Sequence, residues 1–337
     1  MAKKNITIPV FIPHSGCPHQ CVFCNQWRVT GVSEKILPES VHDIIKRYLS
    51  SIPESVDKIE LAFFGGSFTA IPLNEQAQLL STAIPYIHDG IIHSVRISTR
   101  PDYIDSSKLD LLKEFNVKTV ELGVQSFSDK VLKASGRGHG SVEVIEAVSL
   151  LRQYGFRVGI QLMPGLPGDT SESAIMSVHK TIELMPDDVR IYPAVVLKDT
   201  VLEKMFYENK YVPLTIEEAV DLCSVMYRMF REKGINVIRM GLHPMEPGSE
   251  NVVAGPYHDA LGFLIKSRYR RQILESAVKS GIEGNSGIRK LSLLIPEKMK
   301  EEYIGMKKEN ILYIKNKYYL NNIVYSFADI SEPLVLR

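Results

Sequence analysis

The sequence predicts an α/β protein: a partial (βα)6 barrel followed by a small C-terminal α+β domain. Short runs rich in β-branched residues alternate with helical patterns through the first two thirds of the chain, which indicates right-handed βαβ units and a parallel sheet. Glycine-rich and polar clusters follow the ends of successive strands, where barrels of this kind carry their active sites. The predicted strands cover residues 6–12, 58–64, 93–99, 117–122, 156–163 and 189–195.

Five helices are expected between these strands. Ser141 is a suitable N-cap, Glu143 and Glu146 follow it in the first turns, and Gly155 marks the end of the same segment. Six strands are fewer than the eight of a closed barrel, so we expect a partial one. The helices are predicted at residues 38–50, 74–88, 105–115, 141–154 and 170–184.

The remainder of the chain predicts a linker and a second, smaller unit. Residues 242–258 are rich in Gly, Pro and Asn and are expected to be irregular. The predicted domains are a barrel at 1–241, a connecting loop and basic helix at 242–287, and a small α+β domain at 288–337. The predicted elements are helices at 216–233, 261–279, 297–303 and 309–317, and strands at 236–240, 291–295 and 323–327.

The composition is that of an ordinary globular protein. Hydrophobic residues make up 45% of the 337 residues and charged residues 23%, and no apolar run reaches the roughly 18 residues of a membrane span. The first residues lack the apolar stretch of a signal peptide. Only four cysteines occur, three of them clustered, which favours a reducing compartment over a disulfide framework. We therefore expect a cytoplasmic protein without a membrane partner.

Three cysteines lie within eight residues, Cys17, Cys21 and Cys24, with the spacing C-x3-C-x2-C. A cubane 4Fe–4S cluster ordinarily takes four cysteines, so three ligands leave one iron open for chemistry. The alternative is a structural zinc site with His14 or His19 as the fourth ligand, although zinc ligands usually come as two separated pairs. The fourth cysteine, at position 223, is expected to be a small buried hydrophobe.

This cysteine spacing, with the aromatic Phe23 just before the last cysteine, resembles that of the radical S-adenosylmethionine (SAM) superfamily. The resemblance implies a radical SAM barrel and two cofactors, a 4Fe–4S cluster and S-adenosyl-L-methionine. It implies that the open iron chelates SAM and that an electron from a donor such as flavodoxin or ferredoxin yields a 5′-deoxyadenosyl radical. Phe23 is then expected to pack near the adenine, with Ile160 and Leu162 on the other side.

Five further residues are expected to contact the cofactor by resemblance. Gly65-Gly66-Ser67 stands where the superfamily typically carries Gly-Gly-Glu, and glycines let the backbone approach a ligand closely. Without the resemblance, a plain tight turn after a strand is the better explanation of these residues. Gln125 and Arg137 match contacts of the oxygen-independent coproporphyrinogen oxidase branch. An arginine fork suits the methionine carboxylate and a glutamine suits the ribose hydroxyls. The alternative for Arg137 is a surface arginine in a glycine-rich loop.

Several motifs in order, over residues 6–245, are similar to the radical domain of the Elongator catalytic subunit family. These include the segments at 64–70, 98–103, 120–126 and 163–168. The resemblance implies modification of wobble uridines in transfer RNA. Members of that family space the first two cysteines more widely and carry an acetyltransferase domain. Because fewer than a hundred residues follow the barrel here, we do not expect acetyl transfer by this chain.

The C-terminal third carries a basic region. The net charge is +1 overall, but residues 263–317 hold 13 Lys and Arg against 6 Asp and Glu, which points to a polyanion at that end. Arg268, Arg270 and Arg271 surround Tyr269 in one helical segment, a composition that suits phosphates and a stacked base. The alternative is a solvated helix face.

The tail itself is similar to a KH-type RNA-binding module, which grips nucleotides with a Gly-x-x-Gly loop. Gly305 begins such a turn, but Lys308 replaces the second glycine and Lys307 precedes it. A plain α+β cap on the barrel is the alternative. We therefore expect a radical SAM enzyme acting on RNA, with transfer RNA as the favoured substrate. The other interpretations are a radical enzyme for a porphyrin-like small molecule and a non-catalytic cluster- or haem-binding carrier.

Overall fold

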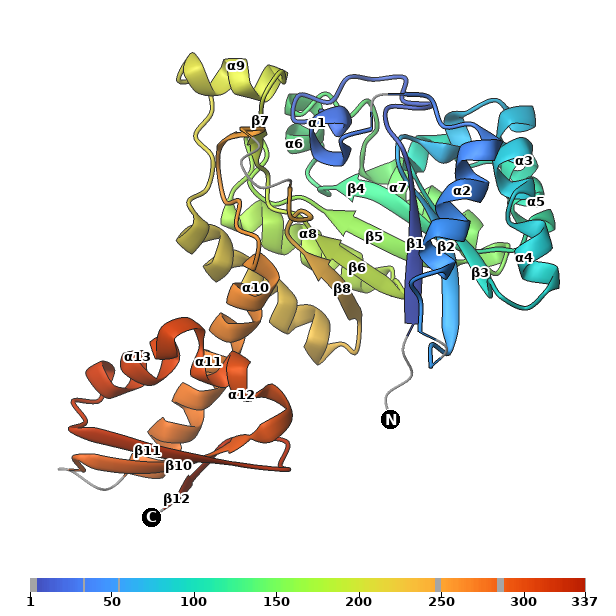
Figure 1. Ribbon diagram of the computed structural model, residues 1–337. Helices are drawn as coiled ribbons and strands as arrows, with labels where there is room; N and C mark the ends of the chain where they lie inside the picture. The colour runs from blue at the N-terminus through green and yellow to red at the C-terminus, as the bar shows by residue number, and fades with distance from the viewer. Residues whose placement is uncertain (1–4, 33, 54, 246–249, 284–287, 337) are drawn as a thin grey trace.

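The computed structural model describes residues 5–32, 34–53, 55–245, 250–283 and 288–336. Its main body is a seven-stranded parallel sheet in the order β1-β2-β3-β4-β5-β6-β8, curled into half a barrel (Figure 1). The partial α/β barrel predicted from the sequence is confirmed. Its strands are β1 (Asn5–Ile12), β2 (Lys58–Gly65), β3 (Ser94–Thr99), β4 (Val117–Gln125), β5 (Arg157–Leu162), β6 (Asp188–Ile191) and β8 (Asn236–Met240).

The middle of β2 is buried on both faces, as its sequence pattern requires. Leu61, Ala62 and Phe63 are consecutive in β2 and none of them is exposed to solvent, which is typical of a parallel strand covered on both sides. Each such apolar side chain contributes roughly 1.5–3 kcal/mol to stability relative to an exposed one. The continuous apolar runs therefore fix the sheet at the centre of the domain.

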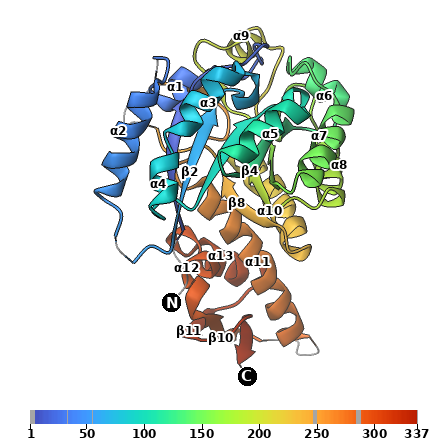
Figure 2. The same cartoon turned by 90° about the vertical axis from the view of Figure 1, so that its right-hand side faces the viewer.

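Most helices cover the outside of the half-barrel, whereas three short ones lie at the carboxyl ends of the strands (Figures 1 and 2). The outer helices are α2 (Pro38–Leu49), α3 (Leu73–Ser81), α4 (Ile84–His88), α5 (Ser106–Glu114), α7 (Ser141–Gln153), α8 (Ser171–Glu183) and α10 (Ile216–Glu232). The short ones are α1 (Gln26–Thr30), α6 (Asp129–Ala134) and α9 (Val201–Tyr207). Short 3-10 turns occupy Phe68–Ala70 and Pro101–Tyr103.

Some details of the predicted elements differ from the structure. The single helix expected at 74–88 is two helices, α3 and α4, because Pro85 lacks an N–H and cannot continue α3. The predicted cap Ser141 is instead the first residue of α7, and Gly140 is the N-cap, its N–H donating to Glu143 at 2.9 Å. Part of the irregular segment 242–258 forms β9 (Val252–Ala254), which pairs antiparallel with β7 (Val196–Leu197).

The C-terminal domain has its own sheet and core. Its strands β10 (Lys290–Pro296), β11 (Asn322–Ala328) and β12 (Leu334–Leu336) lie in the order β11-β10-β12. Strands β10 and β11 are parallel, and β12 is antiparallel to β10. Helices α12 (Lys300–Ile304) and α13 (Glu309–Lys317) cover one side, with short 3-10 turns at Glu297–Met299 and Met306–Lys308.

Helix α11 (Leu261–Ile282) joins the two units. Leu261 and Ile265 belong to the barrel core, whereas Leu274 and Val278 belong to the core of the small domain. The small domain lies at the end of the barrel away from α1, α6 and α9 (Figure 1). The predicted boundaries at 241/242 and 287/288 stay predictions. Across the described ranges, no helix is long and apolar enough to cross a bilayer.

Candidate functional site

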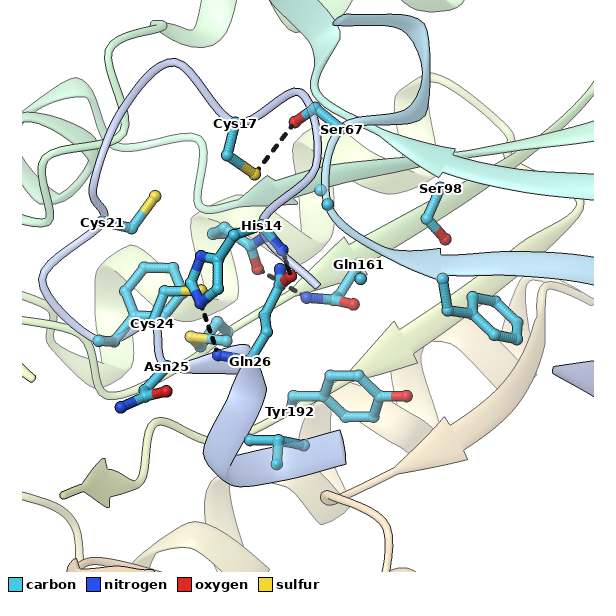
Figure 3. Close-up of a pocket in the computed structure, with 18 of the residues that line it drawn as sticks. His14, Cys17, Cys21, Cys24, Asn25, Gln26, Ser67, Ser98, Gln161 and Tyr192 are labelled. Atoms are coloured by element: carbon cyan, nitrogen blue, oxygen red, sulfur yellow. Dashed lines mark hydrogen bonds between the residues drawn. The ribbon is translucent and has the colours of Figure 1, made fainter. Parts of the chain in front are cut away.

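The predicted cofactor residues gather around one cavity at the carboxyl ends of the strands. The cavity has a volume of about 250 Å³ and opens between the loop after β1, the loop after β2 and the ends of β4 to β6 (Figure 3). Residues of strands β1 to β6 line it in addition to the loops. The predicted residues that line it are Cys17, Cys21, Phe23, Cys24, Gly65, Gly66, Ser67, Gln125 and Arg137.

The three cysteines lie on one tightly turned loop. The Cys17 N–H donates to the His14 carbonyl at 3.1 Å, and the Cys24 N–H donates to the Cys21 carbonyl at 3.0 Å. The three sulfurs lie around a common space beside His14 (Figure 3). Cys21 is 7% exposed, whereas Cys17 and Cys24 are partly exposed to the cavity. One loop therefore offers three thiols to one group.

The thiols resist ionisation as isolated groups. Burial, together with the neighbouring Cys21 and Cys17 sulfurs, raises the pKa of Cys24 to about 12. Burial also raises the pKa of Cys17, against the hydrogen bond from Ser67. Several thiolates in one buried space need a cation to neutralise them. The donor set therefore fits a metal cluster, whose iron would supply that charge.

The zinc alternative lacks its fourth ligand. The His14 Nε2 accepts a hydrogen bond from the Gln26 N–H at 3.0 Å, and so it is not free to bind a metal. The His14 ring also packs edge-on against Trp27, with centroids 4.7 Å apart. The ring of His19 lies against Gly138 instead. Among the residues that the structure describes, no group of three or more His, Cys, Asp or Glu is arranged to hold a single metal ion.

The glycines at the cavity are needed for contacts within the chain. A Cβ on Gly66 would lie 2.1 Å from the Ser15 carbonyl oxygen, and one on Gly16 would lie 2.4 Å from the Ser67 carbonyl oxygen. The loop after β1 therefore packs backbone to backbone on the loop after β2. Ser67 is 1% exposed, and its hydroxyl lies 3.7 Å from the Cys17 sulfur. The cysteine loop is thus seated on the Gly65-Gly66-Ser67 turn.

Gln125 and Arg137 both reach the cavity from the side of β4. Gln125 ends β4 in a left-handed conformation with φ +73°, and its Oε1 accepts a hydrogen bond from Gln161 Nε2 at 3.1 Å. Arg137 is 6% exposed, and its Nη1 donates to the Cys21 sulfur at 3.2 Å. The Arg137 Nε is buried and has no hydrogen-bond partner within the described chain. An unpaired buried donor at this place fits an anionic group of a bound ligand.

The apolar wall of the cavity differs in part from the prediction. Phe23 lines the cavity and, like Met163, packs against the small cluster of Val131, Leu166 and Ala194. Ile160 and Leu162 were expected opposite, but they are 0% and 1% exposed and belong to the barrel core. Because side chains alternate along a strand, β5 presents Gln161 and Met163 to the cavity instead.

The sequence analysis missed a set of charged residues inside the barrel. Arg96 donates from Nε to Glu60 at 2.8 Å and from Nη2 to Asp188 at 3.1 Å. Glu121 accepts from Arg190 Nε at 2.9 Å. Arg190 also donates to the Tyr192 hydroxyl at 3.1 Å, and its guanidinium lies 5.0 Å from the Phe64 ring centroid. The sequence signal that could have identified this set is the presence of charged residues within otherwise apolar strands.

The basic residues predicted to bind RNA lie elsewhere and differ in availability. Arg268 forms ion pairs with Glu217 and Asp221 of α10. Arg270 pairs with Glu302 at 3.2 Å, and the Arg271 guanidinium lies 4.3 Å from the Tyr313 ring centroid. Lys307 and Lys308 are exposed in the turn between α12 and α13. These residues lie on the small-domain side, away from the cysteine loop (Figure 1), and their role in RNA binding stays a prediction.

Comparison with protein families agrees with the geometry. A model of the Radical SAM superfamily matches residues 11–180, half of the chain, and a Radical_SAM C-terminal domain model matches residues 186–271. The chain belongs to the radical SAM superfamily. It is accordingly an enzyme.

Named relatives of this radical SAM chain include RNA-modifying proteins. A tRNA uridine(34) acetyltransferase of Methanocaldococcus infernus is 30% identical over 52% of this chain and 37% of its own length. The Elongator complex protein 3 of Saccharomyces cerevisiae is 27% identical over 52% of this chain and 35% of its own length. The chain therefore spans little more than a third of the length of these relatives.

Solved structures show the same radical SAM fold. The archaeal Methanocaldococcus infernus Elp3 with an N-terminal deletion aligns with a TM-score of 0.64 and 23% identity, over 81% of this chain and 64% of its own. The coproporphyrinogen III oxidase of Escherichia coli, itself titled a radical SAM enzyme, aligns with a TM-score of 0.50 and 17% identity, over 80% of this chain and 59% of its own. At these identities the likeness shows the fold alone.

Proposed function

We propose that this chain binds a 4Fe–4S cluster through Cys17, Cys21 and Cys24, cleaves SAM at it, and modifies transfer RNA. The observation that carries the proposal is the meeting of three thiols from one loop with an unpaired, buried Arg137 Nε in one cavity. When bound, the cluster supplies the electron that breaks the sulfonium of SAM and yields a 5′-deoxyadenosyl radical.

The chain's own residues bind and orient the cofactor. The Arg137 Nε would donate to the methionine carboxylate, and Gln125, which Gln161 holds in place, would donate to the ribose hydroxyls. Phe23 would pack on the adenine and exclude water from the radical. Gly65 and Gly66 keep side chains out of the space between the two loops. The protein's share of the chemistry is this positioning and shielding.

Transfer RNA is the substrate that the relatives favour. The matches to the tRNA uridine(34) acetyltransferase and to Elongator complex protein 3 cover 52% of this chain. A reducing cytoplasm, with a flavodoxin or ferredoxin as electron donor, would suit both the thiols and the substrate. The porphyrin-like alternative is supported only by a likeness of fold.

Cleavage of SAM is tested by replacing single cysteines. Cys24→Ala removes a cluster ligand, whereas Cys223→Ala removes a fully buried thiol of α10 that faces only apolar neighbours. After anaerobic reconstitution and reduction, we expect Cys24→Ala to lose more than about 100-fold of the 5′-deoxyadenosine formed by wild type. Cys223→Ala should match wild type in iron content and product. Full deoxyadenosine production by Cys24→Ala would refute the assignment.

The RNA part of the proposal needs a separate measurement. Mass spectrometry of transfer RNA nucleosides compares cells that carry the protein, cells that lack it, and cells that carry only Cys24→Ala. We expect one modified uridine to disappear from the last two. Unchanged nucleosides in all three would remove transfer RNA as the substrate while leaving SAM cleavage intact.

A further inference from the structure

The Arg137 guanidinium contacts the cysteine loop directly, which a cofactor-binding arginine need not do. Its Nη1 donates to the Cys21 sulfur at 3.2 Å, and its Nη2 donates to the Gly123 carbonyl at the end of β4. Both partners of the sulfur bond are shielded from water, since Cys21 is 7% and Arg137 is 6% exposed. A charged donor in such surroundings makes a strong hydrogen bond.

The position of Arg137 is fixed by its neighbours. Its N–H donates to the Leu132 carbonyl at 3.0 Å. Its own carbonyl accepts a hydrogen bond from Arg100 Nη2, and Arg100 is held by Asp102 through two hydrogen bonds of 3.0 and 2.8 Å. The Arg100 side chain is only 4% exposed. These hydrogen bonds hold the backbone of Arg137, and so they hold its guanidinium beside the Cys21 sulfur.

The side chain beside this arginine stays uncharged. Burial, together with the positive charge of Arg137, lowers the pKa of His139 to about 3. The His139 side chain is fully buried, 3.8 Å from Asp102. The described part of the chain gives Arg137 no acidic partner of its own. No carboxylate bonded to Arg137 therefore offsets its positive charge, and this charge lies beside the Cys21 sulfur.

A cluster cysteine that accepts such a bond changes the energy of reduction. The reduced cluster carries one more negative charge than the oxidised one, and part of that charge resides on the cysteine sulfurs. Hydrogen bonds and positive charge at the sulfurs stabilise the reduced state, and so they raise the reduction potential. The bond from Arg137 Nη1 is of this kind, whereas its Nε is buried and makes no hydrogen bond within the described chain.

We propose that Arg137, acting through Cys21, is a positioning residue that raises the reduction potential of the cluster, and that the Arg100–Asp102 pair holds it there. This inference rests on the proposed function, because it requires the 4Fe–4S cluster. It adds a second role to the same side chain. One edge of the guanidinium would bind the cofactor, and the other would make the cluster easier to reduce.

The test is an EPR-monitored redox titration of reconstituted protein without SAM, so that cofactor binding does not contribute. Arg137→Gln removes both the positive charge and the paired donors of the guanidinium, whereas Arg137→Lys keeps only the charge. We expect Arg137→Gln to disfavour reduction at least tenfold, a fall in midpoint of about 59 mV for one electron. Arg137→Lys should fall between this variant and wild type.

Lys133→Gln is the matched control, because it removes an exposed positive charge from the neighbouring helix α6. Its midpoint should equal that of wild type. A midpoint for Arg137→Gln equal to that of wild type overturns the inference. If Arg137→Gln takes up no cluster, Asp102→Asn decides, because it weakens the Arg100–Asp102 pair that holds Arg137 in place; a midpoint equal to that of wild type then overturns the inference. If wild type itself forms no 4Fe–4S cluster, the proposed function fails instead.

Discussion

The arginines at the cysteine loop and those on α11 behave in opposite ways. Arg137 donates to a sulfur and a carbonyl, and its buried Nε has no partner among the residues that the structure describes. On α11, Arg268 is paired with two carboxylates and Arg270 with one. The difference lies in the hydrogen-bond donors. Arg137 has a donor that makes no hydrogen bond within the described chain, whereas Arg268 and Arg270 form ion pairs that join α11 to neighbouring helices.

This contrast separates a residue's charge from its availability. The side chains of Arg268 and Arg270 are 13% and 14% exposed, although they come from the most basic part of the sequence. Their ion pairs connect α11 to α10 and to α12. A cluster of basic residues therefore does not by itself define a surface for RNA, whereas an unpaired donor in a cavity does indicate a ligand.

The largest effect is expected when the backbone packing under the cysteine loop is disturbed, because the site at this loop depends on that packing. In Gly16→Ala, the new Cβ would lie 2.4 Å from the Ser67 carbonyl oxygen, on a backbone with φ +69°. Neither backbone atom can move without shifting a loop of the site. We expect a loss of about 3 kcal/mol in the free energy of unfolding and poor iron uptake.

Gly155→Ala is the control for Gly16→Ala. Gly155 has a similar φ of +77°, but a Cβ there would meet nothing within 4 Å. It should cost only the left-handed strain, about 1 kcal/mol, and keep the iron content of wild type. Denaturant unfolding and iron analysis of both variants check this. Equal losses in the two would show that the packing of the loops contributes little.

The sequence predicted the barrel well because its signals are local and repeated. Apolar strands such as β2 and turns such as Gly65-Gly66-Ser67 recur at the ends of successive βα units, so their common edge follows from topology. The hydrogen-bond and ion-pair partners of individual polar residues could not be predicted from the sequence. Nothing in the sequence says that Arg268 meets Glu217, because the helices that carry them pair only in the tertiary structure.

The same reason explains the residues that sequence analysis missed at the site. Tyr192 lies just after β6, and Gln161 lies near the end of β5 outside any motif. Both line the cavity because of the curl of the sheet and the alternation of side chains along a strand. The glycines were predicted to approach a ligand, but Gly66 is required by the Ser15 backbone. The Gly65-Gly66 motif identified the position of the site in the sequence, whereas the contact of Gly66 with Ser15 was visible only in the structure.

The second way to test the comparison is to neutralise Arg268. Arg268→Gln breaks its pairs with Glu217 and Asp221, whose own side chains are 78% and 62% exposed. Because the acids are solvated, we expect a loss of only about 0.5–1 kcal/mol. If Arg268 is structural, filter binding of transfer RNA at two salt concentrations stays within about twofold of wild type. A strong, salt-sensitive loss of binding without a loss of stability would instead assign Arg268 to RNA.

The smallest effect concerns the turn between α12 and α13. Lys307 and Lys308 both have left-handed backbones, with φ of +51° and +65°. Lys308→Gly and Lys308→Ala remove the same charge and differ only in the Cβ. The glycine variant should be the more stable by about 0.5–1 kcal/mol, because only glycine adopts this conformation without strain. Denaturant midpoints of the two variants measure it, and an alanine variant of equal stability would contradict the strain.

The same pair of variants also tests the RNA-binding module predicted at this turn. If the Gly305–Lys308 turn grips phosphates through its backbone, as a Gly-x-x-Gly loop does, the glycine variant should bind transfer RNA more tightly than the alanine variant. If the lysine charge alone attracts RNA, the two variants should bind equally and both less well than wild type. If the small domain only caps the barrel, all three should bind alike. The pair therefore distinguishes backbone recognition from electrostatic attraction in a part of the molecule where composition cannot.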